Sequence, residues 1–213
     1  MRWLVVVVAA LAAGCIEQVD QRWSLDHDHV VAVRVTPPRV APGERAVIDA
    51  LVAHAGGPAT VASPAIAGAP LAPPELQTMV WRDGPDWVVT APADVVPVEL
   101  DVVMAFEHPD DDPFYVKKTV GVGEHADNPT LAAIMVAGVP AGAEVVVPID
   151  RDIYVAIASG DRVSWLTSCG TLYQDDVATA YIHADVACDG ELAVVVRAPD
   201  GGVAWQVLPL HAR

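Results

Sequence analysis

The sequence predicts an all-β protein with two tandem β-sandwich domains that follow an export signal. Valine-rich segments alternate apolar and polar residues with a period of two, as half-buried strands do. Hydrophobic residues make up 53% of the 213 residues, and 18 Pro and 15 Gly interrupt them, which favours short strands joined by turns. An apolar run from Trp3 to Ala13 follows a single positive residue, Arg2, which is typical of a secretory signal peptide.

The export signal closes with Leu11-Ala12-Ala13-Gly14-Cys15, in which small residues abut a cysteine. This stretch resembles the lipobox of bacterial lipoproteins. The resemblance implies cleavage before Cys15, acylation of its thiol and of the new amino terminus, and attachment to a membrane by lipid. Ile16 stands where an aspartate is the usual signal for retention in the inner membrane, so the resemblance also implies sorting to the outer membrane.

Two alternatives concern the same segment. A transmembrane helix needs about 20 apolar residues, and the run from Trp3 to Ala13 is shorter. A plain cleaved signal, which leaves Cys15 as an ordinary thiol, is the stronger alternative. With the lipid anchor, the chain divides into a signal peptide at 1–14, the lipidated cysteine and a polar tether at 15–28, a first sandwich at 29–126 and a second at 127–213.

The tether ends in Asp26-His27-Asp28-His29. Residues two apart on a strand share a face, and paired histidines at this spacing are known from zinc sites. Zinc needs three or four ligands, and the sequence announces no partner cluster, so a polar linker that enters a strand explains the motif equally well. The metal assignment stays open.

The first sandwich opens with alternating valines over 31–35, which Pro37-Pro38 interrupts at what we expect to be a sheet edge. Pro42-Gly43 then turns the chain into a second strand over 45–53. This order of valine-rich strand, proline, Pro-Gly turn and second strand resembles the opening of immunoglobulin-like domains in bacterial surface proteins. The resemblance implies immunoglobulin-like sandwiches.

The longest alternation runs from Val96 to Phe106, and 114–122 is its expected hairpin partner. The loop between them carries Asp110, Asp111 and Asp112. Adjacent carboxylates repel one another unless they are solvated or bridged by a cation, and calcium takes about six to eight oxygen ligands. Because the EF-hand spacing is absent, the loop is either a solvated turn or a loop that binds a partner or calcium. No other cofactor is indicated.

The second sandwich is predicted from seven short strand candidates at about ten-residue spacing. They are 131–139, 143–149, 153–158, 162–168, 177–183, 191–197 and 203–210. Val163-Ser164-Trp165 resembles the third strand of immunoglobulin-like domains, which implies that Trp165 lies against the core. With Cys15 acylated, Cys169 and Cys188 remain in an oxidising compartment, and we expect them to form a disulfide, although this pairing departs from the family's usual bridge.

Composition limits the partners and the chemistry. The formal net charge is −16 with only 12 basic residues, which argues against nucleic acid and anionic lipid headgroups as partners. The acidity also serves the solubility of an exported protein. The sequence holds no Gly-x-Ser-x-Gly elbow, no phosphate-binding glycine loop, no His-Glu-x-x-His and no Cys-x-x-Cys, so we expect no enzyme.

The expected function is that of a non-catalytic envelope lipoprotein whose sandwiches bind a protein or glycan or take part in envelope assembly. Recognition is expected at loops carried on a rigid frame, and two acidic loops hold Asp110 to Asp112 and Asp175-Asp176. The alternative is a lipoprotein that binds a metal or small ligand through those loops. An enzyme assembled from isolated residues ranks third.

Overall fold

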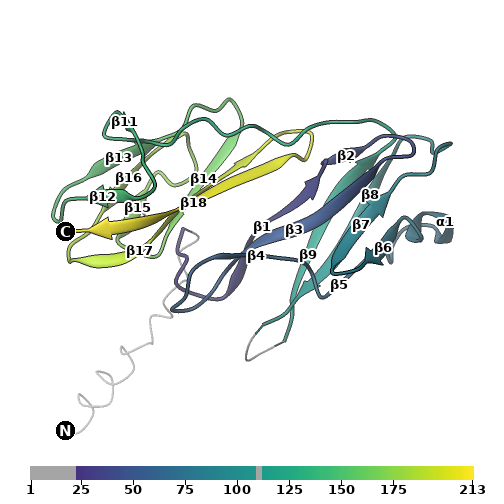
Figure 1. Cartoon of the computed structure of the whole chain (residues 1–213), viewed down its shortest axis with the longest axis horizontal. Helices are drawn as coiled ribbons and strands as arrows, with labels where there is room; N and C mark the ends of the chain where they lie inside the picture. Colours follow the sequence, from purple (N-terminus) through teal and green to yellow (C-terminus); the bar gives the residue numbers. More distant parts are fainter. Residues whose placement is uncertain (1–22, 109–111) are drawn as a thin grey trace, which may run out of the picture.

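The computed structural model describes residues 23–108 and 112–213, and these form two β-sandwiches that lie side by side (Figure 1). The prediction of an all-β fold with two sandwiches is confirmed. Each sandwich closes over a hydrophobic core of its own. No helix in the described part of the chain is long and apolar enough to cross a bilayer.

The first sandwich pairs a sheet of order β1-β3-β7-β6, with β4 also on β3, and a sheet of order β2-β9-β8-β5. The strands of the former are β1 (His29–Thr36), β3 (Arg45–Ala53), β4 (Thr60–Ala62), β6 (Val80–Asp83) and β7 (Asp86–Thr90). Those of the latter are β2 (Arg39–Val40), β5 (Ile66–Gly68), β8 (Val98–Phe106) and β9 (Phe114–Val122), and α1 (Pro74–Gln77) is a single helical turn. The expected hairpin of the longest strand is therefore present as β8 and β9.

The sequence pattern explains how these strands bury their faces. In β3, Ala46, Ile48 and Ala50 point into the core as the period of two requires. Pro37 and Pro38 end β1 because proline cannot donate to a sheet ladder. The chain then crosses to the opposite sheet, where β2 lies at the edge and pairs in parallel with β9.

The second sandwich pairs a sheet of order β11-β10-β13-β16-β15 with a sheet of order β12-β18-β17-β14. The former comprises β10 (Met135–Val136), β11 (Val139–Pro140), β13 (Ile153–Ala156), β15 (Thr171–Tyr173) and β16 (Thr179–His183). The latter comprises β12 (Val145–Val147), β14 (Arg162–Thr167), β17 (Cys188–Arg197) and β18 (Val203–Ala212). Strand β15 was not among the expected strands, because three residues beside a glycine show no measurable period.

Trp165 and the disulfide hold the second core together. Trp165 is fully buried on β14, as its resemblance to the third immunoglobulin strand implied, and its Nε1 donates to the Val177 carbonyl at 3.0 Å. The expected disulfide between Cys169 and Cys188 is confirmed. It links the segment after β14 to the start of β17, and Cys169 is part of the core.

We expect loss of this disulfide to lower the free energy of unfolding by about 3 kcal/mol, because the bridge closes a loop of roughly 20 residues in the unfolded chain. The test is urea denaturation of a Cys169→Ala, Cys188→Ala double variant against the parent. Reductant should shift the parent's transition to lower urea and leave that of the double variant in place. Equal midpoints for the oxidised parent and the variant would contradict the expectation.

The two sandwiches share a third apolar cluster where they meet. We call it the junction cluster; its fully buried members are Leu25, Ala32, Leu51, Ala53, Leu166, Ala193, Val195 and Val203. Apart from Leu25, which precedes β1, these residues lie on the faces of β1, β3, β14, β17 and β18 that point away from the two cores. The sandwiches therefore pack through outer sheet faces, and the contact is dry and apolar at its centre.

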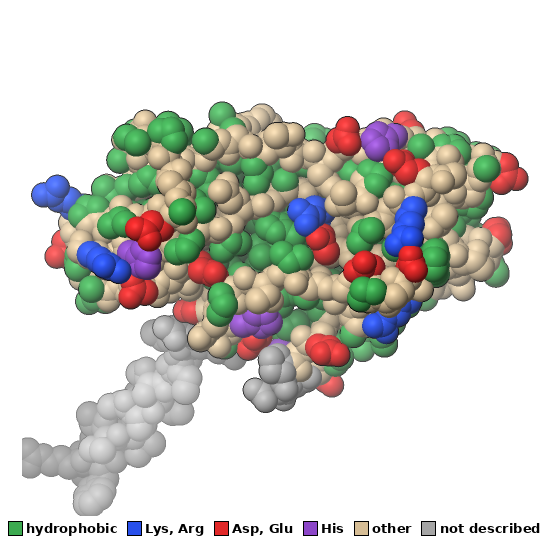
Figure 2. Space-filling view, in the orientation of Figure 1, with side chains coloured by type: hydrophobic (Ala, Val, Ile, Leu, Met, Phe, Trp, Pro, Cys, Tyr) green, Lys and Arg blue, Asp and Glu red, His purple; other side chains and the backbone are tan. Residues whose placement is uncertain are grey.

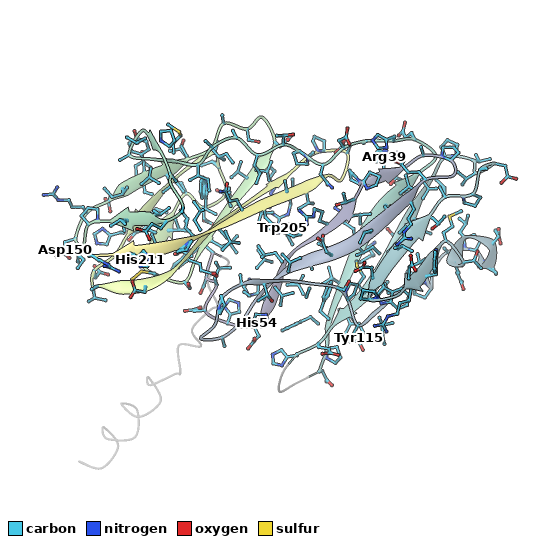
Figure 3. All side chains as sticks on the ribbon, in the orientation of Figure 1. Arg39, His54, Tyr115, Asp150, Trp205 and His211 are labelled. Atoms are coloured by element: carbon cyan, nitrogen blue, oxygen red, sulfur yellow. A yellow bond between two sulfur atoms is a disulfide. The ribbon has the colours of Figure 1, made fainter. Side chains whose placement is uncertain are left out.

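Polar contacts surround the junction cluster. Arg34 forms an ion pair with Asp49 on the neighbouring strand, and its guanidinium lies 4.1 Å from the ring centroid of Trp205 on β18 (Figure 3). Asn128 donates to the Val35 carbonyl at 2.9 Å and accepts from the Val203 amide at 2.8 Å. Contacts from both sandwiches and from the segment between them thus restrain their relative orientation.

The expected tether at 15–28 ends earlier than predicted. Ser24 and Leu25 are buried, the Leu25 amide donates to the Thr167 carbonyl at 2.9 Å, and the Thr167 amide donates to Trp23 at 2.8 Å. This segment adds a short parallel bridge beside β14 before the chain enters the first sandwich. The polar composition concealed it, because two apolar residues among charged ones show no strand period.

Candidate functional site

The structure places only some of the predicted site residues. Cys15, Asp110 and Asp111 lie outside the described residues. Asp112 is exposed just before β9. Asp175 and Asp176 do not stand at a free tip: they line a hollow of about 330 Å³ between the sandwiches, together with residues that include His29, Val31 and Arg197.

The paired histidines of the tether contact each other. The rings of His27 and His29 stack with centroids 4.3 Å apart, and His29 Nδ1 lies 3.0 Å from the His27 carbonyl oxygen. Among the described residues they do not belong to a group of three metal-ligating side chains. The stacking explains the motif by local packing.

Another group could hold a cation. Asp150, His183 and Asp185 bring three ligand atoms within 4.8 Å of one another at the end of the second sandwich, where Figure 3 labels Asp150. Asp152 fixes the imidazole from its other side, with Oδ1 2.8 Å from His183 Nδ1. A carboxylate behind a ligating histidine is common at metal sites. All three carboxylates are exposed, so water also solvates them well.

The hydrogen bond with Asp152 is the main reason that the pKa of His183 lies above its ordinary value of 6.5. A raised folded-state pKa stabilises the fold below the unfolded value, and this contribution is lost as the pH rises through the raised pKa. We expect Asp152→Asn to bring the His183 pKa back toward 6.5, measured by NMR titration of the imidazole. The pKa of His125, raised chiefly by Glu44, should not change. An unaltered His183 titration would refute the assignment.

One triad-like arrangement lies on the first sandwich. His54 Nε2 is 2.8 Å from Thr60 Oγ1, and His54 Nδ1 is 3.5 Å from Asp28 Oδ1. Acyl transfer also needs backbone donors for an oxyanion. Two neighbouring amides already serve the turn, because Ala55 donates to Asp28 and Gly57 donates to the His54 carbonyl. The arrangement therefore closes a surface turn.

A row of tyrosines crosses the outer face of the β13-β16-β15 sheet. Tyr154 on β13 pairs with Tyr181 on β16, and Tyr181 pairs with Tyr173 on β15. Each side chain points away from the core, because its neighbours along the strand, such as Val155, Ile182 and Leu172, are buried. The three residues remain 41%, 39% and 53% exposed.

The tyrosine row lies on the sheet face that the first sandwich leaves open. The opposite sheet of the second sandwich contributes Leu166, Ala193 and Val195 to the junction cluster. The open sheet of the first sandwich differs in chemistry, since its outer face carries hydrogen-bonded polar groups such as Lys117 with Asp101 and has one exposed aromatic residue among those described, Tyr115. Of these two open sheets, that of the second sandwich therefore carries the aligned aromatic residues.

The tyrosine row was not predicted from the sequence. Tyr154 and Tyr181 stand between apolar residues in two expected strands, so the sequence indicates that their side chains point outward. The alignment of the tyrosines could not be predicted, because it depends on the register of three strands, one of which was not expected.

The chain was compared with protein families, curated proteins and solved structures. No family model matches the chain, and no curated protein matches it. Among solved structures, it is similar to Drosophila OTK extracellular domains 3–5, with 8% identity, TM-score 0.29, and coverage of 87% of this chain and 61% of that one. A chimeric titin Z1Z2 has 11% identity, TM-score 0.25, and coverage of 87% and 98%. Bacteroides ovatus SGBP-B in complex with a mixed-linkage heptasaccharide has 9% identity, TM-score 0.23, and coverage of 89% and 64%. The chain thus spans less than two thirds of the first and third of these structures, and at such scores the likeness carries no functional argument.

Proposed function

We propose that this chain is a non-catalytic binding protein of the bacterial envelope, held by lipid on Cys15, which binds a protein or glycan partner through the open face of its second sandwich. The observation that carries the proposal is the row formed by Tyr154, Tyr181 and Tyr173. Exposed aromatic residues aligned on a rigid sheet offer contact area at low cost in side-chain entropy. The disulfide supports an oxidising compartment, which agrees with export.

Two features of the surface bear on the choice between binding and catalysis. Beside the triad-like group of His54, the amides of Ala55 and Gly57 already donate hydrogen bonds within the turn. Acidic side chains are scattered over the face drawn in Figure 2 and form no single acidic patch there, which fits a role in solubility.

The test measures binding of the full chain to isolated envelope material. Tyr181→Arg places a charge at the centre of the row and should abolish binding, whereas Tyr115→Arg, an equal change at an exposed tyrosine of the first sandwich, should not. In cells, Cys15→Ser should release the protein from membranes that survive a salt wash. Binding that Tyr181→Arg leaves intact would overturn the proposed face, and membrane retention of Cys15→Ser would overturn the anchor.

The alternative function, binding of a metal or small ligand by acidic loops, stays a prediction. Replacing Asp112, Asp175 and Asp176 together with Asn removes three charges at nearly constant size. Calorimetry of the parent with calcium decides the point: heat that this variant loses would favour the alternative, and no heat would remove it.

A further inference from the structure

The tyrosine row has the dimensions of a narrow platform. Neighbouring strands lie about 4.8 Å apart, so three aligned residues span about 10 Å perpendicular to the strands. The hydroxyl of Tyr154 reaches beyond its own strand to Gly138, where an added Cβ would lie 2.7 Å from the hydroxyl oxygen. The Tyr154 ring therefore extends along the sheet over the β10–β11 turn, and Gly138 leaves room for it.

The platform is too small for a stable protein interface. With about 200 Å² for a whole tyrosine, the exposed fractions leave roughly 270 Å² of tyrosine surface. A stable protein partner covers about 800 Å² on each side. Along the strands, the outward neighbours of Tyr181 are Thr179 and His183, so the aromatic surface is one residue deep. This shape suits a thin, flat ligand.

The border of the platform selects against negative charge. Asp152 contacts His183, which follows Tyr181 on the same face, and Asp150 and Asp185 stand beside that histidine. The whole chain has a formal net charge of −16. An anionic polymer would be repelled at this border, while carboxylate oxygens accept hydrogen bonds from neutral hydroxyl groups.

We infer that the row of Tyr154, Tyr181 and Tyr173 binds a neutral polysaccharide in which consecutive pyranose rings are linked equatorially into a flat, extended chain; this rests on the proposed function and names its ligand class. A pyranose ring presents a face of C–H groups to an aromatic ring and hydroxyl groups at its edge. One sugar unit is close in length to the spacing of neighbouring strands, about 4.8 Å. A sugar chain that crosses β13, β16 and β15 therefore advances by about one sugar per strand as it passes over the three tyrosines.

The bordering side chains complete the recognition. Thr171 pairs with His183 across β15 and β16, so their polar groups stand beside the Tyr173 and Tyr181 rings. Both ring nitrogens of His183 already lie within hydrogen-bond distance of carboxylates, Nδ1 of Asp152 and Nε2 of Asp185. The Thr171 hydroxyl and the carboxylate of Asp152 can bond the hydroxyl edge of a sugar whose apolar face covers a tyrosine. Stacking supplies most of the affinity, and the hydroxyl groups of the tyrosines themselves are secondary.

The experiment titrates the full chain carrying Cys15→Ser, which keeps it out of membranes, with three probes in a calorimeter. The probes are hexamers of β-1,4-linked glucose, of β-1,4-linked N-acetylglucosamine, and of galacturonate as an anionic control. Tyr181→Ala should raise the Kd of a neutral hexamer at least about tenfold, whereas Tyr181→Phe, which keeps the ring, should stay within about threefold of the parent. Tyr115→Ala is the matched control and should bind as the parent does. Thermal unfolding of each variant confirms that it is folded.

Each other result overturns the inference in a distinguishable way. No binding of either neutral hexamer by the parent, or binding of galacturonate alone, excludes the ligand class. If envelope material still binds in a manner that Tyr181→Arg abolishes, the proposed face stands and its ligand is of another kind. Neutral hexamers that bind equally to the parent and to Tyr181→Ala would place the glycan elsewhere on the molecule.

Discussion

Trp165→Ala should lower the free energy of unfolding of the second sandwich by about 4 kcal/mol, the largest effect that we expect from a single truncation. The side chain has no exposed surface and is the largest fully buried one among the described residues. Its removal leaves a cavity between the two sheets. It also deprives the Val177 carbonyl of the donor that Nε1 supplies, so the cost exceeds that of the lost apolar contacts alone.

The measurement is equilibrium denaturation followed by circular dichroism. Trp81→Ala is the control, because Trp81 is 41% exposed on the edge strand β6 and its Nε1 bonds a side chain, Thr90 Oγ1. It should cost about 1 kcal/mol or less. Equal losses for the two variants would show that Trp165 does not organise the second core.

The strands that the sequence predicted well have one solvent-exposed face. Over residues 98–103 of β8 and 114–119 of β9, more buried positions alternate with more exposed ones. In such strands the period of two is visible because burial differs between the faces. The second sandwich was predicted for the same reason. Its disulfide was predicted separately, from the number of cysteines.

The junction between the sandwiches could not be predicted, because its strands are buried on both faces. Residues 50–53 of β3 are all buried, with Ala50 and Val52 in the first core and Leu51 and Ala53 in the junction cluster. A strand that is apolar on both faces shows no alternation, so the sequence does not reveal what its outer face packs against. At the edge of this cluster, Asp49 of β3 pairs with Arg34 beside Trp205.

The tyrosine row could not be predicted from the sequence for a related reason. Outward tyrosines in separate strands are ordinary surface residues until the pairing register aligns them, and register depends on the whole sheet. The acidic loops were predicted as sites because adjacent charged residues can be recognised directly in the sequence. The structure places Asp175 and Asp176 beside a hollow that His29 and Val31 of the first sandwich also line, and Asp176 is exposed.

The junction cluster should join the two sandwiches into one cooperative unit, and Leu51→Asp should separate them. Leu51 is 1% exposed, and its side chain points away from the first core, so the substitution buries a carboxylate in the junction cluster alone. An unpaired buried charge costs about 4 kcal/mol. We expect the parent's single thermal transition to split into two, because each sandwich keeps its own core.

The control for this variant lies on the adjacent strand. Val61 pairs with Leu51 across β3 and β4 but is 58% exposed, so Val61→Asp adds the same charge next to the same position without burying it. It should leave the single transition intact within about 1 kcal/mol. Small-angle X-ray scattering should show a larger maximum dimension for Leu51→Asp alone, because the apolar contact that holds the sandwiches together would be lost. A single transition with unchanged dimensions in Leu51→Asp would mean that polar contacts, such as those of Arg34 and Asn128 and the hydrogen bond from Lys118 to the Gly201 carbonyl, suffice to fix the orientation without the apolar cluster.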